Sequence, residues 1–184
     1  EKVTNISSMF SNCKNIILLN VSNFNTGNVY DMNSMFYNCR KLKEIDTSHF
    51  NTEKVIDFKS LFHNCNSLTS IDVHNFNTKN VLNMSFMFCS CISLTSLNIS
   101  NFDTYNVLTM ESMFSNCIKI PSIDVSHFNT QNVISMSYMF ALCQNLSIID
   151  ISSFNTQNVK YMNNMFNLNP RLITINIGEM NTKK

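Results

Sequence analysis

The pair Met35-Phe36 recurs through the chain at a strict interval of 26 residues. Its equivalents are Met9-Phe10, Leu61-Phe62, Met87-Phe88, Met113-Phe114, Met139-Phe140 and Met165-Phe166, with no insertion or deletion between copies. A fixed period of roughly 20 to 50 residues is typical of solenoids and propellers. Residues 1–184 are therefore predicted to form a single solenoid of about seven repeats, truncated at the N-terminal end and atypical in the last repeat, residues 165–184.

Each repeat divides into two limbs with different apolar spacing. In residues 42–50, the strand limb, Ile45 and Thr47 alternate with polar neighbours, which favours a strand buried on one face. In residues 29–39, the return limb, apolar offsets mix odd and even values, as in a helix: Val29, Met32, Met35, Phe36 and Cys39. The predicted fold class is an α/β repeat solenoid, a right-handed coil with one parallel β-sheet, short helices or helical turns opposite, and the Met-Phe pairs inward.

Charge and hydropathy exclude several classes of partner. The net charge is +1 and no basic cluster occurs, so nucleic-acid binding is not expected. No apolar run approaches the ~20 residues that a membrane span needs, so this segment is not expected to insert into a membrane. The sequence opens at Glu1, part-way through a repeat, so the missing signal peptide says nothing about localisation.

Six of the seven cysteines occupy one repeat column, and Cys89 is the exception. Disulfide frameworks and zinc sites have other spacings, whereas one cysteine per repeat is the spacing of a packing position. We expect a buried, reduced row, with Cys89 the thiol that reacts first with solvent reagents. The full column is Cys13, Cys39, Cys65, Cys91, Cys117 and Cys143, and the row predicted to be buried and reduced is Cys39, Cys65, Cys91, Cys117 and Cys143.

One repeat also carries a family likeness. The segments Leu68-Thr69-Ser70-Ile71-Asp72-Val73, Phe76-Asn77-Thr78-Lys79-Asn80-Val81 and Met84-Ser85-Phe86-Met87-Phe88 resemble the repeat of BspA-like leucine-rich repeat surface proteins. The resemblance implies a leucine-rich-repeat solenoid at the cell surface or secreted, with adhesion as its role. The chain departs from the pattern LxxLxLxxN because Phe50 stands at the Asn position, so a ladder shifted to Asn51 and Thr52 is expected.

Polar residues of the strand limb form two columns that should point away from the core. They are the candidate binding residues for an extracellular protein or a matrix or host-cell macromolecule. Like carboxylates on neighbouring strands would lie ~4.8 Å apart, and either bond to serine and backbone groups or share a weakly held calcium-like cation. The columns are Asp46, Asp72, Asn98, Asp124 and Asp150, flanked by Ser48, His74, Ser100, Ser126 and Ser152.

No nucleophile–base pair, phosphate loop or convergent set of metal ligands can be assembled, so we expect no enzyme activity, no cofactor and no metal.

Other functions stay open beside adhesion. The chain could be a structural spacer of a longer surface protein, or its unbroken threonine column, which includes Thr26 and Thr182, could order water as ice-binding solenoids do. Uncapped ends would favour end-on self-association.

Overall fold

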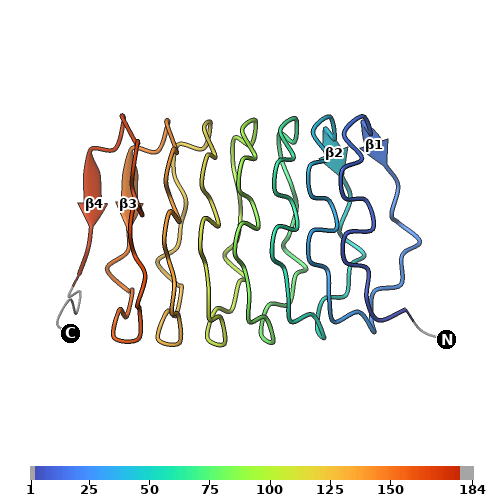
Figure 1. The fold of residues 1–184 in the computed structure, drawn as a ribbon, viewed down its shortest axis with the longest axis horizontal. Coiled ribbons are helices and arrows are strands. Elements are labelled where there is room, and N and C mark those ends of the chain that lie inside the picture. Colours follow the sequence, from blue (N-terminus) through green and yellow to red (C-terminus); the bar gives the residue numbers. More distant parts are fainter. Residues whose placement is uncertain (1–2, 179–184) are drawn as a thin grey trace.

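The computed structural model describes residues 3–178, which form a stack of similar coils (Figure 1). The coils lie side by side along the long axis, with the N-terminal coil at one end and the C-terminal coil at the other. The solenoid expected from the repeat is therefore present. Successive coils bury one another, because one repeat alone cannot cover its own apolar side chains.

Four short strands lie on the strand limbs of the terminal coils. β1 (Leu18–Leu19) pairs in parallel with β2 (Glu44–Ile45), and β3 (Ile148–Asp150) pairs in parallel with β4 (Thr174–Asn176). The parallel direction agrees with the prediction, but one continuous sheet does not form. Pro121 gives part of the reason, since it stands in a column of backbone donors and has no N–H to offer the preceding coil.

The prediction of helices in the return limb is wrong, because residues 3–178 contain no helix. Amides in this limb alternate between two partners. Ser34 and Phe36 donate to the carbonyl oxygens of Lys59 and Leu61 in the next coil, at 2.8 and 3.0 Å. The intervening Met35 donates within its own coil, to Met32 at 3.2 Å. A helix would keep every amide within its own segment, so the bonds between coils replace it.

The backbone of the return limb also turns left-handed twice in each coil. In the second coil these positions are Ser34, with φ 56°, and Asn38, with φ 62°, and equivalent residues recur along the stack. A helix of L-residues does not tolerate such φ values. Apolar spacing alone does not distinguish this series of turns from a helix, because both bury the same columns.

A second line of parallel pairing runs along the return limb. Single bridges join Asp31 to Asp57, Asp57 to Asn83, and so on from Asn5 to Tyr161. Backbone bonds of 2.8–2.9 Å run beside them, from Ile56 to Tyr30 and onward to Leu108 and Ile134. The coils are thus held together on both limbs, and not by a single sheet.

The core is a row of stacked phenylalanine rings. Phe10, Phe36, Phe62, Phe88, Phe114, Phe140 and Phe166 have successive ring centroids 5.4–6.0 Å apart, with planes within 12° of parallel. The methionines that precede Phe36, Phe88, Phe114 and Phe140 are fully buried, so the inward orientation of the pairs is confirmed in the stack interior. At the N-terminal end the pattern is incomplete, because Met9 is 54% exposed.

The row of Cys39, Cys65, Cys91, Cys117 and Cys143 is buried and reduced, as predicted. Each of these five thiols donates to a phenylalanine carbonyl of the preceding coil, as Cys65 does to Phe36 at 3.2 Å. Burial raises the pKa of Cys39 to about 11. The prediction for Cys89 is wrong: it is buried, in a column whose neighbours Ser115 and Ala141 are also small and buried, and Cys13 is the exposed thiol.

Candidate functional site

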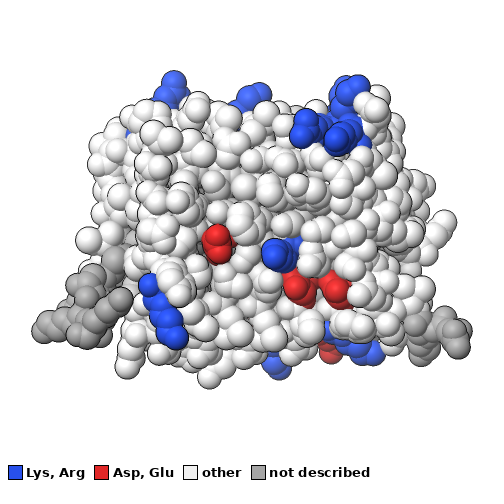
Figure 2. Space-filling view, viewed as in Figure 1, with Lys and Arg blue, Asp and Glu red and all other residues white. Residues whose placement is uncertain are grey.

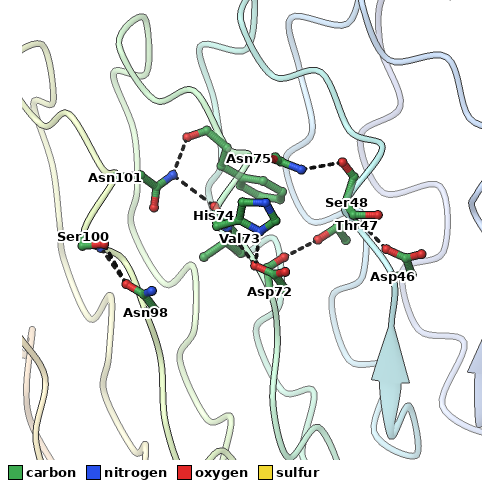
Figure 3. A network of polar contacts seen from close by, with 11 residues as sticks. Asp46, Thr47, Ser48, Asp72, Val73, His74, Asn75, Asn98, Ser100 and Asn101 are labelled. Carbon is green, nitrogen blue, oxygen red and sulfur yellow. Dashed lines mark hydrogen bonds and ion pairs between the residues drawn. The ribbon is translucent and has the colours of Figure 1, made fainter.

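The candidate binding row lies on the strand limb with its side chains toward solvent. All ten predicted residues occupy equivalent places in successive coils, and Figure 3 shows part of the row. Ser48 is half-buried and the other nine are exposed: Asp46, Asp72, Asn98, Asp124, Asp150, His74, Ser100, Ser126 and Ser152. The structure therefore brings the predicted residues onto one surface.

Each acidic or amide side chain of the row closes a turn in its own coil. Oδ1 of Asp46 accepts from the amide of Ser48 at 2.9 Å, and Asn98 makes the same bond to Ser100 at 3.1 Å. This is the local geometry for which Asp and Asn are favoured in turns. The expectation that the carboxylates bond to serine and backbone groups is confirmed.

The same bonds set the acidity of the row. The hydroxyl and amide of Ser48 lower the pKa of Asp46 below its ordinary value, and Ser126 does the same for Asp124. The pKa of Asp72 is lowered first by the amide of His74 and then by its ring, whose Nδ1 lies 2.6 Å from Oδ1. These carboxylates are therefore ionised at neutral pH, and the row is anionic.

Two further columns serve the fold. Thr52 donates from Oγ1 to the carbonyl oxygen of Asn77 at 3.1 Å and accepts from its amide at 2.7 Å, so the shifted ladder expected from Thr52 is present. Asn51 instead closes a turn, and the amide ladder lies elsewhere, as in the 2.8 Å bond from Asn106 to the carbonyl of Lys79.

The threonine hydroxyls cannot form the proposed water-ordering surface. The described members of the column, from Thr26 to Thr156, are at most 6% exposed. Thr182 lies outside the described residues. The ice-binding interpretation is therefore wrong for this column, because its hydroxyls are not available to ordered water.

Within residues 3–178, no three His, Cys, Asp or Glu side chains gather as a metal site would require. The same residues include no helix with the length and apolar character to cross a membrane.

The sequence analysis missed an exposed apolar column on the return limb, here called the outer stripe. Its members are 37–45% exposed and are linked by the backbone bonds of that limb: Tyr30, Ile56, Leu82, Leu108 and Ile134. Each follows directly after a buried valine. Two adjacent apolar columns in an extended segment must point to opposite sides, so this spacing was a usable signal.

Comparison with solved structures gives a distant similarity. A leucine-rich repeat protein from Bacteroides ovatus ATCC 8483 shares 19% sequence identity, with a TM-score of 0.46, over 86% of this chain and 45% of that one. This chain thus spans less than half the length of that protein. A comparison with curated proteins found no match.

The matches to a protein-family model together cover nearly the whole chain. One model matches residues 4–118 and again residues 93–184, and its family is described as Mycoplasma protein of unknown function. The two matches overlap within the repeat array, as expected when one model can align with successive coils. This chain belongs to the DUF285 family.

Proposed function

We propose that this chain is an interaction module of a secreted or surface-displayed protein, and that it binds an extracellular macromolecule along the strand limb. The observation that carries the proposal is the exposed anionic row of Asp46, Asp72, Asp124 and Asp150. The resemblance to BspA-like surface proteins supports the extracellular setting and an adhesive role.

The row suits many weak contacts better than one strong contact. Closing the turn occupies Oδ1 of Asp46, Asp72 and Asp124, and the second carboxylate oxygen is geometrically free to accept from a partner. Equivalent groups recur once per coil, so an extended partner with cationic or hydrogen-bonding groups gains affinity by multivalency. Exposed charges are screened by salt, so attachment should weaken as ionic strength rises.

The spacer function remains the second candidate, because the same side chains have a structural task. The turn bonds of Asp46 and Asp124 account for their presence without any ligand. A substitution that removes the charge and keeps the turn can separate the two functions. Asparagine meets this requirement, since Asn98 closes the equivalent turn.

The test compares two double variants with matched charge changes. Asp72→Asn with Asp124→Asn removes two of the four carboxylates of the row, whereas Asp31→Asn with Asp57→Asn removes two carboxylates of the return limb and also keeps its turns. Attachment is measured to cultured host cells and to a basement-membrane coat. The proposal expects a clear loss in the first variant only. Equal attachment by both variants and the wild type would favour the spacer.

A further inference from the structure

Two tyrosines of the return limb depart from their repeat columns and line the same surface pocket. Tyr138 occupies a position that is serine in four of the other coils, including Ser34 and Ser112. Tyr161 occupies the column of Asp57 and Asn83. Most polar residues of the stack have equivalents in other coils, so a place where two exceptions meet is unusual.

Both exceptions break a local rule of the fold. Tyr138 has φ 59°, a left-handed conformation that is costly for a bulky side chain. Tyr161 cannot close the turn that Asp57 closes by accepting from the amide of Lys59 at 2.7 Å. Local inconsistencies that persist in a regular structure are expected at functional sites.

The pocket combines an apolar wall with aromatic and anionic groups. Its volume is about 490 Å³, within the range of small-ligand sites. Leu108 and Ile134 of the outer stripe form the apolar part, Tyr138 and Tyr161 are 38% and 59% exposed, and Glu111 supplies a carboxylate. Charged side chains are sparse on the face of the molecule shown in Figure 2.

Glu111 gives the pocket its charge preference. Among residues 3–178 no basic side chain forms an ion pair with this carboxylate, and the only ion pair of that part of the chain is His74 with Asp72. A partner that enters the pocket therefore meets an unpaired negative charge between aromatic and aliphatic surfaces.

We propose that this pocket binds an arginine side chain of a partner polypeptide. A guanidinium group stacks on tyrosine rings and donates two parallel hydrogen bonds to a carboxylate such as Glu111. The three-carbon stem of arginine packs on aliphatic surface, here Leu108 and Ile134. The ammonium group of lysine has the same charge, but it has no planar surface to stack on a tyrosine ring and no pair of parallel N–H donors for the carboxylate. Lysine should therefore bind more weakly.

This site is independent of the strand-limb row, since it lies on the return limb and shares no residue with it. The candidate binding row can therefore fail its test while the arginine site stands, and the reverse also holds.

The test uses N-acetyl-arginine-N-methylamide as the probe, titrated into the whole chain and followed by NMR of the tyrosine ring protons. Saturable shifts of Tyr138 and Tyr161 are expected. The citrulline analogue, which is neutral and nearly isosteric, should give no saturable shift. The lysine analogue should bind more weakly than the arginine probe.

Substitutions toward the residues of neighbouring coils separate binding from folding. Tyr161→Ser restores the residue found at Ser135, and Tyr138→Asn restores that found at Asn164. Both variants should stay folded, with thermal stability kept or raised, and weaken binding roughly two- to fivefold. Tyr161→Phe should retain binding. Glu111→Gln should weaken binding roughly tenfold.

Phe86→Asn is the matched control, because Phe86 has the same exceptional position as Tyr138, with φ 60°, two coils away. It should leave binding unchanged. Equal binding of arginine and citrulline probes, or full binding by Glu111→Gln, would overturn the proposal. So would the absence of saturable shifts, or a response of the two tyrosines to the neutral disaccharide maltose without a response to arginine.

Discussion

The hydroxyl of Thr26 joins two coils through both of its hydrogen-bonding functions. Oγ1 donates to the carbonyl oxygen of Asn51 at 3.0 Å and accepts from the amide of the same residue at 2.8 Å. The arrangement recurs at Thr52 with Asn77 and at Thr104 with Asn129. One buried side chain thus satisfies both backbone groups of a residue 25 positions away. This explains why threonine fills the column without exception.

Replacing Thr52 with valine should therefore destabilise the stack strongly. Valine keeps the shape of threonine but leaves the amide and carbonyl of Asn77 without this partner in a part-buried corner. We expect a loss of about 2–3 kcal/mol in the free energy of unfolding, measured by urea denaturation. Thr52→Ser keeps the hydroxyl and should cost only about 1 kcal/mol for the lost methyl group. Equal losses in both variants would mean that packing, and not hydrogen bonding, fixes the column.

The repeat period predicted the stack because it constrains every coil at once. The position of Phe36 and Cys65 within the repeat was enough to predict that their columns point inward. The position of Asp46 and Asp72 was likewise enough to predict that their row points outward. The conformation of the return limb could not be predicted in this way. Apolar spacing reports which side chains are buried, but not whether the amide of Phe36 bonds within its coil or to the next one.

The misplacement of Cys89 has a similar origin. It lies outside the cysteine column, and its own column holds residues as different as Tyr37 and Ser115. Burial there depends on side-chain size in each coil. The pocket at Tyr138 and Tyr161 also escaped the sequence analysis, because exceptions to a repeat acquire meaning only when the fold shows that they are neighbours.

Thiol labelling should show one fast site. Cys13 is exposed, whereas Cys39, Cys65, Cys89 and the later cysteines are buried. A chromogenic disulfide reagent applied to the native protein should therefore modify one thiol rapidly, and Cys13→Ser should remove that fast phase. The remaining thiols should react only as the stack opens. Peptide mapping that placed the fast label on Cys89 would contradict the structure.

The buried thiols should also make the stack sensitive to alkali. Burial raises the pKa of Cys39 to about 11 and that of Cys143 to about 12, whereas the same thiols in the unfolded chain lose their protons near their ordinary pKa. Above about pH 9 the unfolded state thus binds fewer protons than the folded state, and the free energy of unfolding falls as the pH rises.

Removing one buried thiol should make that fall less steep. Cys91→Ala should reduce the slope between pH 9 and 10 by up to about 1.4 kcal/mol per pH unit, even though the variant is less stable at pH 7. Cys13→Ala, at an exposed position, should leave the slope unchanged. Denaturant titrations at several pH values measure both quantities. Parallel pH profiles for Cys91→Ala and the wild type would show that other groups cause the alkaline loss.

The N-terminal end of the stack should mediate self-association of this 184-residue chain. A pocket of about 680 Å³ opens there, lined by apolar groups of the first coil that include Ile6, Met9 and Phe24. The equivalents of Met9 in the interior, such as Met87, are fully buried by a neighbouring coil. A second copy stacked on this end could bury the exposed side chains in the same way. The weight-average mass in sedimentation velocity should therefore rise with protein concentration.

Met9→Lys places a charge in the contact and should abolish this rise, because burying an unpaired ammonium group is costly. Leu82→Lys is the matched control: Leu82 is an exposed apolar residue of the outer stripe, on the side of the stack and not at its end. It should associate as the wild type does. If Leu82→Lys prevents association while Met9→Lys does not, the copies contact one another along the outer stripe, and the end-on arrangement is wrong.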